Sequence, residues 1–173
     1  MKCYAVVDTN VIVSALITKN PDSPPRQVFR AMLTGAIVPL YHPDILAEYE
    51  EVPCRKKFHL QVETVRTVVD AIRQFGIEVQ PKPTGEILID MDDLVFYEVA
   101  MEKRDDGAYL VTGNQKHYPV RHFIVTPRRN DRNSGKVTAV RPKGGQKIPL
   151  PKGAKAEKVP GKALTKRRKS DIL

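Results

Sequence analysis

Short apolar runs alternate with helical patterns through the first 126 residues, and this alternation is the strongest constraint on the fold. The apolar runs are typical of short buried strands, and they lie at 3–7, 36–40, 77–79, 108–111 and 122–125. No two of them are close enough in sequence to form a hairpin, so neighbouring strands require crossover connections. The sequence therefore predicts an α/β fold with a mostly parallel sheet covered by helices.

The segments between these runs have the apolar spacing of helices. The longest pattern runs from about residue 58 to 75 and ends at Gly76. Three shorter patterns follow Asn10, Pro25 and Pro43, and another follows the acidic run at 90–93. These helices would cover the predicted sheet.

Charge divides the chain into two parts. Residues 1–126 have a net charge of −3, whereas residues 127–173 have a net charge of +12 and are rich in Pro, Gly and Lys. We expect a globular domain at 1–127 and a basic low-complexity tail at 128–173 that is largely disordered or extended. Such a tail indicates a polyanionic partner, with nucleic acid as the first candidate, although a tail that only aids solubility remains an alternative.

Several classes of protein do not fit the sequence. No apolar run approaches the length of a membrane span, and no secretory signal pattern is present. Cys3 and Cys54 form no disulfide framework and fit a reducing cytoplasm. Zinc-type Cys and His clusters, a Ser-His-Asp order and a Gly-rich phosphate loop between strand and helix are also absent. We therefore expect a cytoplasmic protein that does not bind membranes.

The first strand ends at a sharp polar break, Asp8-Thr9-Asn10. In open α/β sheets, ligands bind beyond the carboxyl ends of the strands, where Asp8 would stand. Thr9 or Asn10 would then cap the following helix. The alternative is that Asp8 is itself only a capping or turn residue.

Two more acids face inward from predicted helices. On a helix that begins near Pro43, Glu48 lies about 60° from Ile45 and so borders the buried face, while Glu50 and Glu51 point away. Asp93 shares a stripe with Phe96 further along the chain. A half-buried carboxylate is unfavourable unless a partner satisfies it. Capping could satisfy Asp93 or Asp92, and an ion pair could satisfy Glu48.

Carboxylates brought together repel one another and need a cation. Hard oxygen ligands of this kind suit Mg²⁺ or Mn²⁺. A site of this kind can activate water and hold the attacking and leaving oxygens of a phosphodiester. The sequence therefore predicts a divalent-metal site for hydrolysis of nucleic acid.

Four blocks of the sequence together resemble a PIN domain. They are 6–11 (VVDTNV), the helix around Glu48, 92–96 (DDLVF) and 111–117 (VTGNQKH), and the match runs in order across about residues 2–126. Within that superfamily, the blocks are most similar to bacterial toxin components of toxin–antitoxin systems, related to the VapC toxins. The resemblance implies an α/β/α sandwich and a metal-dependent ribonuclease.

The resemblance also implies roles for particular residues. It makes Asp8, Glu48 and Asp93 the metal-binding acids, with Asp8 central and Asp92 as the helix cap. Asn114 stands where many PIN domains have another acid; its carbonyl oxygen can still coordinate, but the site loses one negative charge. We also expect Asn10 and Thr112 to support the site. From the tail, we expect an RNA anchor at Lys166, Arg167, Arg168 and Lys169.

Three functions remain open from the sequence. The leading hypothesis is an Mg²⁺- or Mn²⁺-dependent endoribonuclease that prefers single strands, with RNA, an antitoxin protein and a second copy of the chain as expected partners. The second is a catalytically weakened PIN domain that acts as an RNA-binding or scaffold protein, which Asn114 and the tail favour. The third is a nuclease that acts on DNA. A phosphatase with an aspartyl nucleophile is disfavoured, because Asn10 replaces the second acid that such enzymes place two residues after the first.

Overall fold

The structure, a computed structural model, describes residues 3–127 and 140–141. Its strands are β1 (Cys3–Val7), β2 (Ile37–Tyr41), β3 (Ile77–Glu78), β4 (Tyr109–Val111), β5 (Ile124–Pro127) and β6 (Val140–Arg141). They form one sheet in the order β3-β2-β1-β4-β5-β6. Every pairing is parallel except that of β5 with β6, which is antiparallel. The predicted mostly parallel sheet is confirmed.

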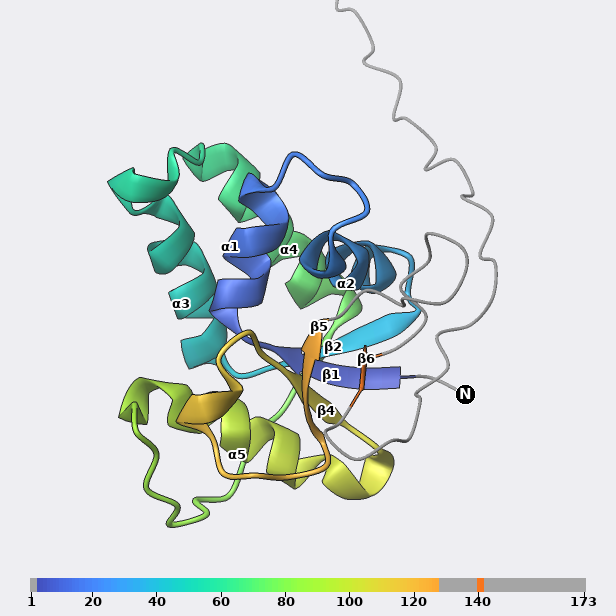
Figure 1. The fold of residues 1–173 in the computed structure, drawn as a ribbon, viewed down its shortest axis with the longest axis vertical. Helices are drawn as coiled ribbons and strands as arrows, with labels where there is room; N and C mark the ends of the chain where they lie inside the picture. The colour runs from blue at the N-terminus through green and yellow to red at the C-terminus, as the bar shows by residue number, and fades with distance from the viewer. Residues whose placement is uncertain (1–2, 128–139, 142–173) are drawn as a thin grey trace, which may run out of the picture.

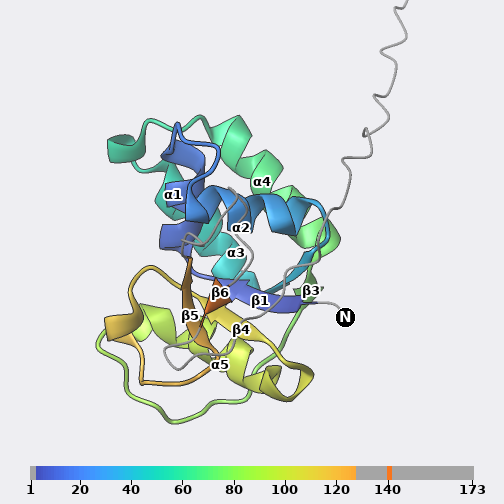
Figure 2. The same ribbon diagram turned by 45° about the vertical axis from the view of Figure 1, so that its right-hand side comes forward.

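Helices cover both faces of this sheet. They are α1 (Thr9–Ile17), α2 (Pro24–Leu33), α3 (Pro43–Glu51), α4 (Val62–Phe75) and α5 (Leu94–Glu102). In both ribbon views, α1 to α4 group on one side of the strands and α5 lies on the opposite side (Figures 1 and 2). The protein is thus the expected α/β/α sandwich. No helix in the described part of the chain is long and apolar enough to cross a membrane.

The central strands β1, β2 and β4 are largely buried on both faces, which explains their continuous apolar sequences. Val6, Ile37, Leu110 and Val125 are almost fully buried in the centre of the sheet. Helices pack on these strands through apolar stripes: in α4, Val65, Val69 and Ile72 are buried at helical spacing. This core fixes where each strand ends, and those ends carry the polar residues discussed below.

The position of β1 creates the crevice in which a ligand can bind. β1 pairs with β2 on one side and with β4 on the other, so the chain leaves the end of β1 in one direction and later returns to its opposite side. Ligands in open α/β sheets bind at such a switch point, beyond the carboxyl ends of the strands. Asp8 follows β1 directly and Thr112 follows β4 directly.

The structure changes one predicted boundary. The helical pattern at 58–75 begins later than expected, because Lys56–Phe58 forms a separate 3-10 turn and α4 starts at Val62. His59 lies between them with φ 54, a left-handed conformation that interrupts a right-handed helix.

Part of the expected tail belongs to the sheet. Val140 and Arg141 pair with Pro127 and Thr126 of β5. The rest of 128–173, including the expected anchor at 166–169, lies outside the described residues, so its predicted disorder and RNA contacts stay predictions.

Candidate metal centre

Asp8 lies at the junction of β1 and α1 and is 5% exposed. Its backbone N–H donates to the Val111 carbonyl at 2.9 Å, which continues the β1–β4 pairing by one residue. Its Oδ1 accepts from the Asn10 N–H at 3.0 Å, so Asp8 is the N-cap of α1. The expectation that Thr9 or Asn10 would cap this helix was therefore wrong, because the carboxylate already occupies that position. Asp8 caps a helix and also faces the crevice.

The ends of β1 and β4 are joined by side chains. Thr112, which is fully buried, donates its hydroxyl to Oδ2 of Asp8 at 2.5 Å and accepts from the Asn114 N–H at 2.9 Å. Asn10 Oδ1 accepts from the Gly113 N–H at 3.1 Å. These contacts place Asn10 and Thr112 where the sequence predicted support for the site. Thr112 orients the Asp8 carboxylate, and Asn10 holds the chain that leads to Asn114.

Glu48 enters the crevice from α3. Its neighbour Tyr49 is buried and donates its hydroxyl to the Val7 carbonyl, which fixes α3 against the end of β1. Glu48 itself is half-buried, whereas Glu50 and Glu51 are exposed, as the helical phase predicted. Within the described residues, Glu48 forms no ion pair with Arg or Lys, so a simple ion pair does not explain its burial.

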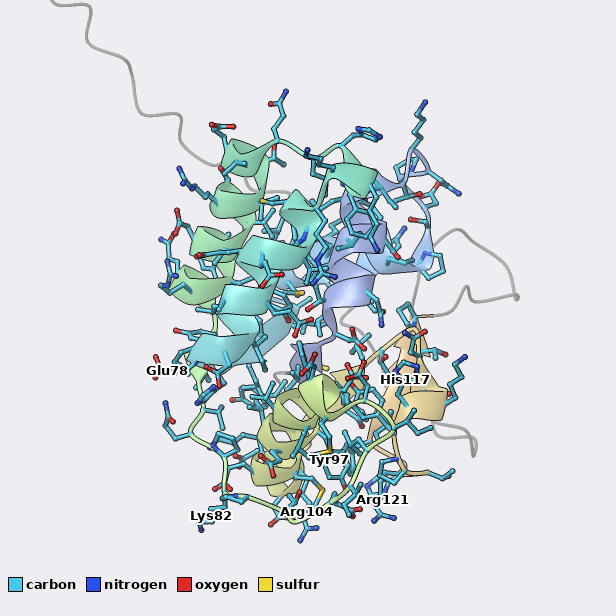
Figure 3. All side chains as sticks on the ribbon, turned by 90° about the vertical axis from the view of Figure 1, so that its left-hand side faces the viewer. Glu78, Lys82, Tyr97, Arg104, His117 and Arg121 are labelled. Atoms are coloured by element: carbon cyan, nitrogen blue, oxygen red, sulfur yellow. The ribbon has the colours of Figure 1, made fainter. Side chains whose placement is uncertain are left out.

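Asp93 reaches the crevice from the start of α5, with its side chain 18% exposed. The local cap is Asp90, whose Oδ1 accepts from the Asp92 N–H at 3.2 Å. The expected capping role of Asp92 was therefore wrong: Asp92 is exposed, and the residue two positions earlier makes the capping bond. Nδ1 of His117 lies 3.0 Å from Oδ2 of Asp93. Figure 3 shows His117 beside the N-terminal end of α5.

One cleft contains all of the acids predicted from the globular part. Its volume is about 1030 Å³, and its lining includes Asp8, Asn10, Glu48, Asp92, Asp93 and Asn114. Segments separated by 40 residues or more therefore meet at one edge of the sheet. Thr112 lies behind Asp8 and does not line the cleft.

The acids in the cleft perturb one another. Burial raises the pKa of Asp8, and the Asp93 charge adds to this rise, while the Thr112 and Asn10 hydrogen bonds oppose it. Burial also raises the pKa of Glu48, with further increases from Asp8 and Asp93. Burial likewise raises the pKa of Asp93, and the hydrogen bond to His117 opposes this rise. Each acid is thus destabilised in its charged form, as expected where a cation is needed to balance the charge.

Two residues that line the cleft and one beside it were missed as site residues from the sequence. Asp90 and His117 line it, and Tyr118 is buried behind Asp93. His117 and Tyr118 follow the polar break after β4, three and four residues beyond Asn114. The histidine that closes the block 111–117 was the available signal, but only the fold shows that it meets Asp93.

The donor set fits a divalent cation. Asp8, Glu48 and Asp93 offer carboxylate oxygens in the cleft, and Asp90, Asp93 and His117 each offer one ligand atom, all within 4.8 Å of one another. The Thr9 and Tyr118 hydroxyls are buried, face Glu48 and Asp93 respectively, and make no hydrogen bond of good geometry. Both hydroxyls are thus directed at carboxylates that repel one another, an arrangement that a bound cation would stabilise.

Together, the sheet and the cleft define an α/β domain with an acidic site at the carboxyl ends of its parallel strands. The PIN domain family model matches residues 4–116, and the chain belongs to this family. PIN domains are generally metal-dependent nucleases. The chain is also similar to an uncharacterized protein of Methanocaldococcus jannaschii, MJ1680, with 28% identity over 118 residues, which cover 66% of this chain and 73% of that protein. No solved structure matches the chain.

Proposed function

We propose that this protein is an Mg²⁺- or Mn²⁺-dependent endoribonuclease that cleaves phosphodiester bonds in single-stranded RNA. The observation that supports this most is the convergence of Asp8, Glu48 and Asp93 on one cleft, each with its pKa raised by burial. A bound divalent cation would supply Lewis acidity and a water of lowered pKa. Both accelerate hydrolysis of a phosphodiester.

The residues of the chain would have distinct roles in this chemistry. Asp8, Glu48 and Asp93 would hold the cation through carboxylate oxygens. Thr112 fixes the Asp8 carboxylate in one orientation by donating to Oδ2, so the ligand needs no reorganisation when the cation binds. Asn114, exposed at the edge of the cleft, would offer its side-chain carbonyl oxygen to a water or to the phosphate.

Another part of the same cleft supports RNA as the substrate. Arg55, Lys57 and Phe58 line it there, after α3 ends. The cations suit phosphates on either side of the scissile bond, and the aromatic ring suits an unstacked base, as in single-strand recognition. Lys57 Nζ lies 4.8 Å from the centroid of the Phe58 ring, so the charge and the stacking surface are adjacent.

We further propose a biological setting from the four sequence blocks that resemble VapC-related toxins. In this setting, the protein is the toxin of a toxin–antitoxin pair in the cytoplasm, and an antitoxin protein inhibits it. The protein would act as a homodimer. The basic residues at 166–169 would add affinity for RNA.

Cleavage of a fluorescent single-stranded RNA, with a DNA oligonucleotide of the same sequence beside it, tests the activity. We expect RNA cleavage with Mg²⁺ or Mn²⁺, none with EDTA, and none above background for Asp8→Asn. Asp105→Asn is the matched control, because its side chain is 94% exposed and lies outside the cleft lining. Binding of RNA without cleavage by the wild type would favour the RNA-binding or scaffold function, and cleavage of DNA alone would favour a DNA nuclease.

A further inference from the structure

The group Asp90, Asp93 and His117 differs from the acids around Asp8 because it includes a nitrogen ligand. Its three candidate ligand atoms all lie within 4.8 Å of one another. Ligands bound to the same cation at about 2.0–2.2 Å lie roughly 3–4 Å apart, so small side-chain adjustments would bring all three onto one ion. Asp90 uses Oδ1 for its capping bond, which leaves its other oxygen available.

The backbone around His117 is held independently of Asp93. His117 ends a 3-10 turn, Gln115–His117, and its N–H donates to the Asn114 carbonyl at 3.0 Å. The Gln115 side chain donates to the Ile124 carbonyl at 2.9 Å, which ties the turn to β5. His117 is therefore presented to Asp93 by the sheet, as expected for a preorganised ligand.

Tyr118 provides a second, independent indication of a bound group. It is 5% exposed, and its hydroxyl makes no hydrogen bond of good geometry. The hydroxyl is directed at the Asp93 carboxylate. Burial raises the pKa of Tyr118, and the charges of Asp8, Asp93 and Glu48 raise it further. A cation held by Asp93 and its bound water would give this donor an acceptor.

We propose that Asp90, Asp93 and His117 bind a divalent cation beside the Asp8–Glu48 side of the cleft, with a ring nitrogen of His117 as a direct ligand. Imidazole suits Mn²⁺ and other first-row transition metals, whereas Mg²⁺ prefers oxygen ligands and water. His117 therefore makes the protein prefer Mn²⁺ to Mg²⁺. Only the role of this cation in catalysis rests on the proposed function. The binding of the cation can be measured without RNA.

Pulsed electron paramagnetic resonance on the full chain, stripped of metal and loaded with a substoichiometric amount of Mn²⁺, tests the nitrogen ligand directly. We expect the ¹⁴N modulation of coordinated imidazole in the wild type and its replacement by a ¹⁵N pattern when histidine is labelled. His117→Gln should lose the modulation. His122→Gln should keep it, since His122 is exposed and packs edge-on against Phe123 outside the cleft lining.

Competition between Mn²⁺ and Mg²⁺ separates a ligand from a positioning residue. If His117 is a ligand, His117→Gln should weaken Mn²⁺ binding roughly 10-fold or more and weaken Mg²⁺ binding much less. The magnitude follows from the roughly 10–100-fold losses of metal affinity seen when outer-shell partners of a metal are removed. Equal losses for both metals, or a wild type without ¹⁴N modulation, would overturn the proposal. A wild type that shows the modulation but cleaves no RNA would retain this site and refute the proposed function alone.

Discussion

Replacing Thr112 with Val removes one hydroxyl and tests how the site holds its central acid. Val has nearly the same shape as Thr, so the fully buried pocket around residue 112 stays filled. The change deletes the 2.5 Å bond to Asp8 Oδ2 and the 2.9 Å bond from the Asn114 N–H. Asp8 keeps its bond from the Asn10 N–H and loses only the hydroxyl donor.

The magnitude follows from the charge of the acceptor. A hydrogen bond to a charged group contributes about 1.5–3 kcal/mol, and a buried charge that loses its donor carries the full desolvation cost. The bond from the Asn114 N–H is neutral and only partly buried, so its loss adds less than the loss of the bond to Asp8. We expect Thr112→Val to lower the free energy of unfolding by about 2–3 kcal/mol at pH 7. At roughly 4 °C per kcal/mol, this corresponds to about 10 °C in Tm.

Urea unfolding in the presence of EDTA is the appropriate assay, because bound metal would add its own stabilisation. Thr112→Ser is the matched control: it keeps the hydroxyl and should cost less than about 1 kcal/mol beyond the lost methyl group. The difference between wild type and Thr112→Val should also shrink on acidification, because protonated Asp8 depends less on the donor. A Val variant as stable as the Ser variant, or a difference independent of pH, would refute the reasoning.

Three further predictions concern the cap, the pH dependence and the tail. Asp90→Ala should lower the free energy of unfolding by about 1 kcal/mol through the lost cap, whereas Asp92→Ala should change it by less than about 0.5 kcal/mol. Thermal unfolding that ranks the two variants the other way would contradict the capping assignment. The folded-state pKa of Asp8 is raised, so the folded protein binds the proton of Asp8 more tightly than the unfolded chain does. The metal-free wild type should therefore lose stability relative to Asp8→Asn as pH rises from about 3.9 towards that raised pKa. Parallel urea-unfolding profiles of the two proteins between pH 4 and 7 would contradict this. Removing 142–173, which leaves β6 intact, should weaken RNA binding and flatten its salt dependence, measured by fluorescence anisotropy. The log–log slope should fall by roughly 0.7 for each RNA phosphate that the shortened chain no longer neutralises. An unchanged slope would leave the tail without a binding role.

The sequence predicted the sheet well, and it identified acids that the fold brings to one cleft, because both depend on local patterns. Buried parallel strands have continuous apolar runs, and Glu48 could be placed by helical phase alone. The capping assignments failed for a different reason: Asp8, Thr9 and Asn10 are all good N-cap residues, and only backbone geometry selects among adjacent candidates. The contact between His117 and Asp93 spans 24 residues and depends on how β4 and α5 sit across the sheet, which no local pattern encodes.

The placement of β1 between β2 and β4 also determines when a newly made chain can complete the cleft. β1 can pair with β2 once about 41 residues have emerged, but its other edge stays open until Val111 is available to pair with Val7. Glu48 and Asp8 then exist for much of synthesis without Asp93 and His117. During translation, a nascent chain therefore carries half of a cleft, and under the proposed function it could not yet cleave RNA. The long-range strand pairing that slows folding also delays assembly of the site until most of the domain has been made.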